Sequence, residues 1–214
     1  MEMKKHENLP VYEIPTEILL KGGNHLLKNQ YECFAYTVAS HRFICAPERI
    51  DLDEQLCYDL GYRIYELLYH GGAIVVEEGD ICFAYFGRSG NTFKEDILNY
   101  VVNWLKEKGI NATIDKNDVL VDGCKCLGIG HNKHGVVDFY TGYIGVNPNL
   151  ENIKKICNKP MAKTPRGLGE YGIDTEQVRE MFLAFCKEYD EKQKSKNAKL
   201  NIPLNIFNKK KLGV

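Results

Sequence analysis

Between Ile110 and Asn147 the chain is a series of short apolar runs separated by turn residues, and this pattern constrains the fold more than any other feature. The runs INATI, DVLV, CKCLGIG and VVDFYTGYIGVN have the composition of short strands. They are separated by Asp-Lys-Asn, by Asp122-Gly123 and by HNKHG, which are typical of hairpin turns. Consecutive hairpins pair antiparallel, so we expect much of the sheet to be antiparallel.

Further strands and helices flank this series. We expect a strand region over 32–47, ended by Pro47, and then a helix over 51–70, capped by Asp51 and ended by Gly71-Gly72. Two short strands or one bent strand should follow around Gly79-Asp80. A helix over 91–109 has a Thr92–Glu95 capping box, and a last helix is capped by Asp174. The charged residues from Lys187 indicate a frayed helix end or a linker. This order of elements predicts an α+β sandwich of mixed, largely antiparallel sheet with flanking helices, not a doubly wound parallel sheet.

The composition argues against some functional classes for this protein. The 214 residues are 44% hydrophobic and 27% charged, with a net charge of -1, which argues against a dedicated nucleic-acid binder. The first residues contain no apolar run typical of a signal peptide, and no later run is long enough to cross a bilayer. We therefore expect a cytoplasmic protein without membrane or nucleic-acid partners. Its expected parts are an N-terminal segment (1–30), a catalytic domain (31–186) and a charged tail (187–214).

The eight cysteines are scattered and form no disulfide framework, which favours reduced thiols. Cys124 and Cys126 are close in sequence, but the chain does not supply the paired ligands of a four-coordinate metal site. His131 and His134 are expected to lie on an exposed loop.

Three segments contain residues suited to chemistry. Gly71 and Gly72 directly precede a strand, the segment NDVLVDGCKCLG places Lys125 just after a tight turn, and KTPRGLGEYGIDTEQV is a basic loop followed by a capped helix. Taken singly, a glycine pair is usually a helix C-cap, and a lysine beside a turn is usually a solvated charge.

Together the three segments resemble the lipoate-protein ligase and biotin-protein ligase family. The catalytic motif of that family, N-D-[aliphatic]3-D-G-x-K-[aliphatic]-x-G, is similar to Asn117–Gly128 at nearly every position. Its glycine loop resembles YHGGAIVVEEGDICF at Gly71, Gly72, Gly79 and Phe83, and its Lys-Ser loop resembles Lys163–Arg166. The similarity extends over residues 31–185.

The resemblance implies a fold like that of class II aminoacyl-tRNA synthetases and biotin ligases. It also implies an ATP- and Mg²⁺-dependent ligase that activates lipoate, or a similar acid, as an acyl adenylate. The acyl group then passes to a lysine of a carrier domain, such as the glycine cleavage H protein or a 2-oxoacid dehydrogenase E2 subunit. Lys125 is the implied catalytic cation and Asp118 the implied metal ligand. The implied nucleotide- and ligand-binding residues are His70, Gly71, Gly72, Ala73, Asn117, Asp118, Asp122, Gly123 and Gly128.

The glycine loop departs from the family pattern. The family arginine, three residues before the glycines, has no counterpart within Leu67–His70, and His70 replaces the first of three glycines. Asp138 and Thr141 stand where a related branch of octanoyl transferases has cysteine and histidine, so we do not expect a cysteine-dependent transferase. The alternative to a ligase is a homologue without catalytic activity that binds a small ligand or a protein.

Overall fold

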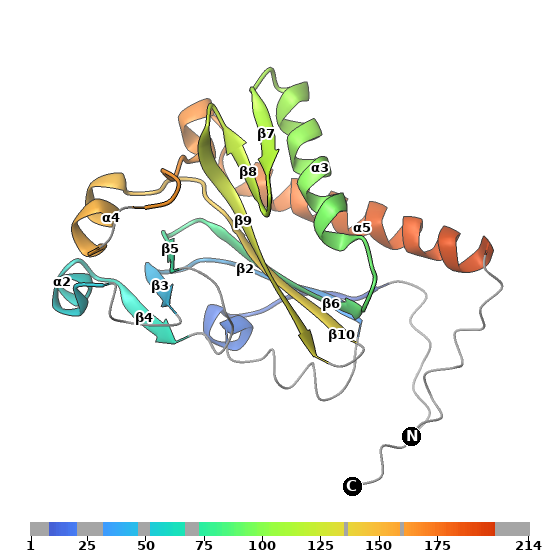
Figure 1. Cartoon of the computed structure of the whole chain (residues 1–214), viewed down its shortest axis with the longest axis horizontal. Coiled ribbons are helices and arrows are strands. Elements are labelled where there is room, and N and C mark those ends of the chain that lie inside the picture. Colours follow the sequence, from blue (N-terminus) through green and yellow to red (C-terminus); the bar gives the residue numbers. More distant parts are fainter. Residues whose placement is uncertain are drawn as a thin grey trace, which may run out of the picture.

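The computed structural model describes residues 9–20, 32–46, 52–66, 73–134, 137–158 and 161–199. Within these residues a seven-stranded sheet is covered by long helices on one face and by a three-stranded sheet on the other (Figure 1). None of the helices in these ranges combines the length and apolar character needed to cross a membrane.

The large sheet is mixed but mostly antiparallel, as the sequence predicts. In spatial order its strands are β1 (Val11–Glu13), β2 (Cys33–Val38), β6 (Ile81–Arg88), β10 (Val137–Ile144), β9 (Cys124–His134), β8 (Asp118–Val121) and β7 (Ala112–Asp115). Only the pairing of β1 with β2 is parallel among these described strands. The expected α+β class with a largely antiparallel sheet is therefore confirmed.

Two of the predicted hairpins have the expected turns. In the third, the first strand extends into the residues predicted to form the turn. Asp122 and Gly123 join β8 to β9 with φ angles of 49° and 78°, the left-handed conformations that a two-residue hairpin turn requires. The prediction of a turn over HNKHG is wrong for its first four residues, because β9 continues through His134 opposite β10. His131 is therefore a strand residue, with its ring stacked on Tyr140 at 4.4 Å and 3.1 Å from the Asp138 carboxylate.

The small sheet has the strand order β4 (Arg63–Glu66), β3 (Phe43–Ala46), β5 (Ile74–Val76). The predicted strand region 32–47 is divided between the two sheets, because the chain turns between β2 and β3. The two strands predicted around Gly79-Asp80 are confirmed, and they also belong to different sheets.

The predicted helix over 51–70 is mostly wrong. Helix α2 (Glu54–Asp59) is short, and Asp53 caps it by accepting a hydrogen bond of 3.0 Å from the backbone N–H of Leu56. Gly61, with a φ angle of +82°, redirects the chain into β4, which pairs with β3. The cap predicted at Asp51 lies outside the described residues.

Helices α3 (Phe93–Glu107) and α5 (Thr175–Lys199) cover one face of the large sheet. Their buried side chains form the main core, with Phe93, Val101 and Phe182 fully enclosed. The Thr92–Glu95 capping box does not form: the Thr92 hydroxyl donates to Asp96.

The start of α5 agrees with the predicted cap. The Asp174 carboxylate accepts from the Gln177 N–H at 2.8 Å, and the Gln177 side chain accepts from the Asp174 N–H at 3.0 Å. The helix continues without a break past Lys187 to Lys199, where the sequence indicated a frayed end or a linker. Tyr189 explains part of this extension, because its ring is buried against the main core.

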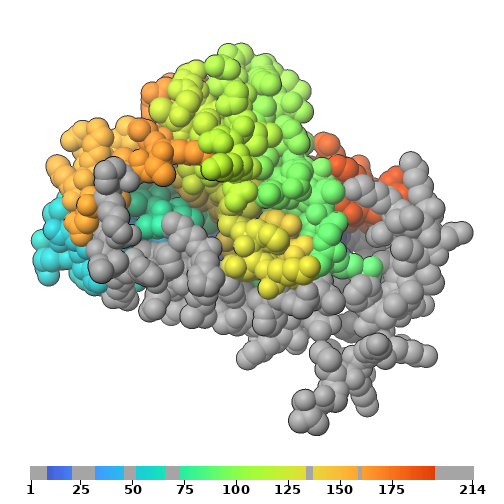
Figure 2. Space-filling model, viewed as in Figure 1, coloured from blue at the N-terminus to red at the C-terminus, as the bar shows by residue number. Residues whose placement is uncertain are grey.

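The opposite face of the large sheet carries the side chains that matter for the site. Cys82, Ala84 and Phe86 of β6 alternate with residues of the main core and pack against the small sheet. Helix α4 (Leu150–Ile156) follows β10 and lies beside α2 at one end of the molecule (Figure 2). Between α4 and α5 runs the loop that contains Lys163, ending in a short 3-10 helix (Leu168–Tyr171).

Candidate functional site

A β-bulge decides which face of the sheet receives the Lys125 side chain. The pairing of β8 with β9 shifts between Val119 and Leu120, which leaves Cys126 as an extra residue in β9. Cys126 and Leu127 are consequently both buried in the main core. Because two successive side chains take the helical face, Lys125 is turned to the opposite face.

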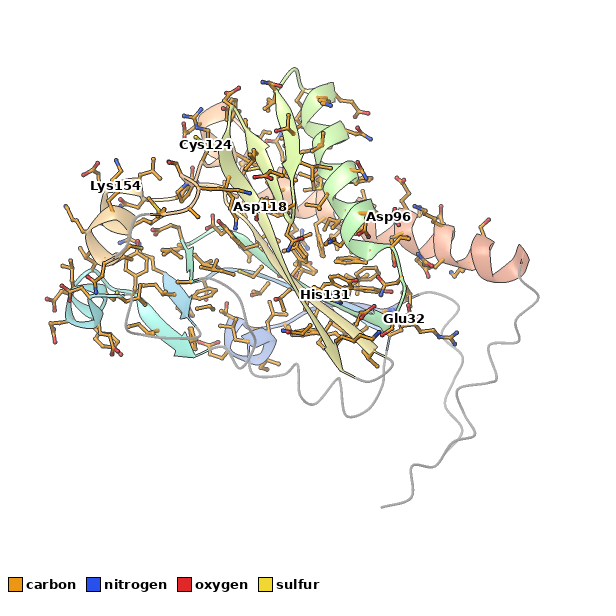
Figure 3. All side chains as sticks on the ribbon, viewed as in Figure 1. Glu32, Asp96, Asp118, Cys124, His131 and Lys154 are labelled. Carbon is orange, nitrogen blue, oxygen red and sulfur yellow. The ribbon has the colours of Figure 1, made fainter. Side chains whose placement is uncertain are left out.

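On that face Lys125 meets two other residues predicted from the sequence. Its Nζ lies 3.0 Å from Oδ1 of Asp118, and Asp118 pairs with Gly128 across the two strands. A β-carbon on Gly128 would lie 2.4 Å from Cε and Nζ of Lys125 and 3.1 Å from Oδ1 of Asp118. The missing side chain at Gly128 therefore leaves the space that the lysine occupies. Figure 3 shows Asp118 on the hairpin, with Cys124 nearer its turn.

A second lysine, to which the sequence analysis assigned no role although its loop resembles the Lys-Ser loop of the family, joins this cluster. Lys163 Nζ lies 2.6 Å from Oδ2 of Asp118 and 2.8 Å from Oδ2 of Asp115. Burial alone would lower the pKa of Lys163, but its hydrogen bonds to Asp115 and Asp118 outweigh this and raise that pKa. Lys163 is therefore charged at neutral pH, and Asp118 holds one ammonium group on each carboxylate oxygen.

The loop around Lys163 is attached to β9 by main-chain hydrogen bonds. The N–H of Lys125 donates to the carbonyl of Thr164 at 2.8 Å, and the N–H of Arg166 donates to the carbonyl of Lys125, also at 2.8 Å. These bonds place Pro165 opposite Lys125 in a parallel bridge. The only sequence signal for this arrangement is the basic Lys163–Arg166 loop, because the pairing itself depends on tertiary structure.

Tyr143 connects the lysine cluster to an apolar cavity. It pairs with Gly128 in β9 and with Cys82 in β6. The Nζ of Lys125 lies 5.6 Å from the centre of its ring, a distance at which a cation is attracted to an aromatic face. Burial raises the pKa of the Tyr143 hydroxyl, so this side chain is neutral at physiological pH.

The cavity lies between the large sheet, the small sheet and the helical turn of residues 16–20, and its volume is about 50 Å³. The lining residues are mostly apolar, and those with polar groups are Thr141 and Tyr143, which have hydroxyls, and Cys45 and Cys82, which have thiols. The lining residues are Leu19, Leu20, Phe43, Cys45, Ile74, Val76, Cys82, Phe83, Phe139, Thr141, Gly142 and Tyr143. The apolar lining, with a lysine beside one lining residue, has the chemical character that suits the apolar chain of a carboxylic acid. The cavity volume is far below the roughly 300–1,000 Å³ of ligand pockets, so such a chain would require the cavity to widen.

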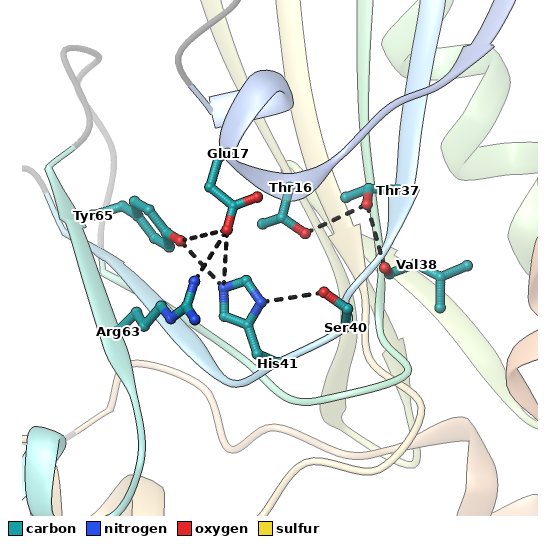
Figure 4. A network of polar contacts seen from close by, with 8 residues as sticks. All are labelled: Thr16, Glu17, Thr37, Val38, Ser40, His41, Arg63 and Tyr65. Carbon is teal, nitrogen blue, oxygen red and sulfur yellow. Dashed lines mark hydrogen bonds and ion pairs between the residues drawn. The ribbon is translucent and has the colours of Figure 1, made fainter.

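A set of polar contacts holds the N-terminal turn over this cavity (Figure 4). Oε1 of Glu17 lies 3.1 Å from Nη1 of Arg63 and accepts from the Tyr65 hydroxyl at 3.4 Å, while His41 also contacts Tyr65. A hydrogen bond from its own backbone N–H, together with the charges of His41 and Arg63, lowers the pKa of Glu17. Since Leu19 follows two residues later, the Glu17 contacts fix the turn that closes the cavity.

The remaining predicted residues of the glycine loop and the strand start are only partly described. His70, Gly71 and Gly72 lie outside the described residues. Ala73 is exposed and immediately precedes Ile74, which lines the cavity. Asn117 lies next to Asp118, and its side-chain oxygen accepts from Nζ of Lys94 at 3.4 Å.

Asp122 and Gly123 lie at the hairpin turn. The Asp122 carboxylate accepts from the Tyr171 hydroxyl at 2.5 Å and lies 3.6 Å from Nη1 of Arg166. The contacts of this carboxylate are therefore with the loop before α5, whereas Lys125 is bound to Asp118.

A Mg²⁺ ion that bridges phosphates needs only one or two protein carboxylates. Asp118 and Asp115 offer such oxygens side by side, although both already contact Lys163. Over the described part of the chain, no group of three or more histidine, cysteine, aspartate or glutamate side chains is placed to hold a metal by itself. These carboxylates therefore fit a phosphate-bound Mg²⁺, but not a metal held by protein ligands alone.

Several solved structures share this fold. The lipoate protein ligase of Thermoplasma acidophilum, described with bound lipoic acid, has a TM-score of 0.71 and 15% identity, and the match covers 86% of each chain. A bipartite lipoate protein ligase from the same archaeon, described together with its E2 lipoyl domain, also has a TM-score of 0.71, with 14% identity over 86% of this chain and 84% of that one.

Two further solved structures have a similar fold. Plasmodium falciparum LipL1 in complex with lipoate has a TM-score of 0.72 and 17% identity, covering 86% of this chain but only 63% of that one. Lipoate-protein ligase A bound with ATP has a TM-score of 0.71 and 14% identity, covering 86% and 85%. At these identities the likeness establishes the fold alone.

The comparison at the level of sequence families is more specific. A search of curated proteins found no matching relative. The family model described as the lipoyl protein ligase A/B catalytic domain matches residues 46–188, which is more than half of the chain and includes both lysines of the cluster. The resemblance noted in the sequence is thereby confirmed: this chain belongs to the lipoyl protein ligase A/B catalytic domain family.

Proposed function

We propose that the protein is a cytoplasmic, ATP-dependent ligase that activates lipoate, or a similar acid, as an acyl adenylate and transfers the acyl group to a carrier-protein lysine. The observation that carries this proposal is the position of Lys125, whose ammonium group lies over Tyr143 at the wall of an apolar cavity. Family membership supports ligase chemistry, and relatives of the same fold are described with lipoate, ATP or a lipoyl domain.

In the activation step, an oxygen of the acid's carboxylate forms a bond to the α-phosphorus of ATP. The bond from that phosphorus to pyrophosphate breaks, and its electron pair leaves with the pyrophosphate. The two reacting groups are both anions, so a fixed cation between them lowers the barrier. Lys125, held by Asp118 on a rigid strand, is placed for this role.

In the transfer step, the amine of a carrier lysine attacks the acyl carbon. A nitrogen–carbon bond forms, the carbon–oxygen bond to AMP breaks, and the amine loses a proton to solvent. We assign the carrier to the class of lipoyl domains, such as the H protein or an E2 subunit. Gly71, Gly72 and Ala73 are proposed to lie against the acyl adenylate.

A phosphate-bound Mg²⁺ would be held by Asp118, with Asp115 as a second oxygen donor. The ion would neutralise part of the triphosphate charge. Asn117, Asp122 and Gly123 stay proposed nucleotide-binding residues through their positions next to this cluster.

The direct test measures the mass of a lipoyl domain after incubation with the protein, ATP, Mg²⁺ and lipoate. We expect the wild-type protein to add one lipoyl group, and Lys125→Ala to lower the rate by about 10²-fold or more. Lys133→Ala, an exposed lysine on the same strand, is the matched control and should act as wild type. Folded wild-type protein that leaves the domain unmodified would refute the proposal.

The second candidate is a homologue that binds the adenylate or a partner without doing chemistry. The sequence of the glycine loop favours it, because Leu67–His70 contains no arginine. Calorimetric titration separates the two: binding of lipoyl-AMP without any transfer supports a binding module, whereas binding of neither ATP nor lipoyl-AMP excludes the ligase mechanism.

A further inference from the structure

Lys163 shares the Asp118 carboxylate with Lys125, although the two lysines come from different elements. We propose that Lys163 is a second cationic residue of the activation site, which contacts the α-phosphate of ATP and of the acyl adenylate while Lys125 contacts the acid. This inference rests on the proposed function and assigns part of the same site.

Charge balance is the first reason. Lys125 and Asp118 form a neutral pair, and a neutral pair offers no net charge to an incoming phosphate. The side chains of Asp118 and Lys163 are only 16% and 22% exposed, so the charges of this cluster are poorly screened by solvent. The two ammonium groups and the carboxylates of Asp118 and Asp115 sum to zero, but Asp118 alone contacts both ammonium groups, so the second positive charge is balanced by Asp115. The side chain of Asp115, the other partner of Lys163, is 46% exposed and compensates less.

The second reason is the position of each lysine, which suits Lys125 and Lys163 to different roles. Lys125 lies over Tyr143, which lines the apolar cavity, and is therefore the lysine closer to an acid in that cavity. Lys163 binds the other oxygen of Asp118 and reaches Asp115 at the end of β7. A phosphate joined to the acid's carboxylate would extend from Lys125 toward Lys163.

Rigidity is the third reason. The main chain next to Lys163 is bonded to Lys125 itself, through the Thr164 carbonyl and the Arg166 N–H. Cations that are fixed before the substrate arrives stabilise a developing charge without reorganisation. Lys163 adds no covalent step: the bonds that form and break at the α-phosphorus are those given above, and Lys163 stabilises the phosphate oxygens while pyrophosphate leaves.

The test uses the full chain and three substitutions: Lys163→Gln, Lys163→Arg and the control Lys154→Gln. Lys154 is an exposed lysine on α4, away from Asp118 (Figure 3). Calorimetry measures affinity for lipoate and for a non-hydrolysable lipoyl-AMP analogue, and a pyrophosphate-release assay measures activation. Melting temperatures report on folding.

For Lys163→Gln we expect activation to fall about 10²-fold and the adenylate analogue to bind at least about tenfold more weakly. Lipoate should bind within about twofold of wild type, since its carboxylate meets Lys125. Lys163→Arg should recover most of the analogue affinity, and Lys154→Gln should match wild type in every assay. A merely structural lysine would instead weaken both ligands together and lower the melting temperature.

Unchanged activation and analogue binding in Lys163→Gln would overturn the inference and leave the proposed function standing. Equal loss of both ligands in Lys163→Gln and Lys163→Arg would also overturn it. If the glutamine variant does not fold, Lys163→Met serves as the neutral variant. Wild-type protein that neither activates lipoate nor binds the analogue would instead refute the proposed function itself.

Discussion

At the scale of single residues, the site depends on Gly128 as much as on Lys125. The lysine side chain occupies the space where a β-carbon at Gly128 would stand, and the nearest atoms are the flexible end of that side chain. A side chain at this position would therefore displace the ammonium group and leave the backbone unchanged.

We expect Gly128→Ala to lower the rate of adenylate formation by about 10²-fold, because it moves the cation away from the reacting groups. The free energy of unfolding should change by about 1 kcal/mol or less, since only the lysine tip must move. The rate of pyrophosphate release and urea unfolding measure the two effects.

Gly130→Ala is the matched control. It lies two residues further along β9, and its β-carbon would approach no atom closer than 3.4 Å, the Thr141 hydroxyl. Equal activity of the two variants would show that the space at Gly128 is not needed for Lys125 to function.

At the scale of elements, the sequence predicted those that form through local contacts. The hairpins of β7, β8 and β9 are set by turn residues, and the cap of α5 by Asp174 and Gln177, so all were readable along the chain. The prediction of one helix over 51–70 was wrong because leucines at helical spacing also suit a short helix followed by a strand. The pairing of β4 with β3 decides between the two. The Lys163 loop was noted, but no role was predicted for Lys163 for the same reason: its partner Asp118 is remote in sequence.

The N-terminal turn is the element most open to a direct test. Glu17→Gln removes the ion pair with Arg63, and because both side chains are exposed this pair contributes little to global stability. Local opening should therefore increase while global stability barely changes. We expect faster amide hydrogen exchange in residues 16–20 and little change elsewhere in the molecule.

Glu78→Gln, at an exposed glutamate after β5, should leave the exchange of residues 16–20 as in wild type. If Glu17→Gln exchanges no faster than this control, the Glu17 contacts do not hold the turn.

At the scale of the whole molecule, the buried Asp80 carboxylate links the two sheets to the chain after β10. It accepts from the N–H of Val146 at 2.7 Å and from the N–H of Glu77 at 2.9 Å. Burial nevertheless outweighs these hydrogen bonds and raises the pKa of Asp80 from 3.8 to about 6. The native protein therefore binds this proton more tightly than the unfolded chain does.

A carboxyl whose pKa is higher in the folded state makes the protein less stable as pH rises through the interval between the two values. For Asp80 that interval runs from about 4 to about 6. The loss is on the order of 2–3 kcal/mol, at about 1.4 kcal/mol per pKa unit. We expect Asp80→Asn to abolish this part of the pH dependence, measured as the free energy of unfolding in urea at several pH values.

Asp59→Asn, at an exposed carboxylate of α2, should keep the wild-type slope between these pH values. Parallel curves for wild type and Asp80→Asn would show that Asp80 has the same pKa in the folded and unfolded protein.

The extra residue in β9 makes the orientation of Lys125 depend on the register of the hairpin. If the hairpin paired without this bulge at its present length, strict alternation from Leu127 would turn the Lys125 side chain from the face of Asp118 to the aromatic interior, with no intermediate orientation available. A deletion of Cys126 would remove the bulge and still leave Lys125 opposite Leu120, on the face of Asp118. The register of the hairpin is therefore as much a part of the proposed site as the lysine it presents.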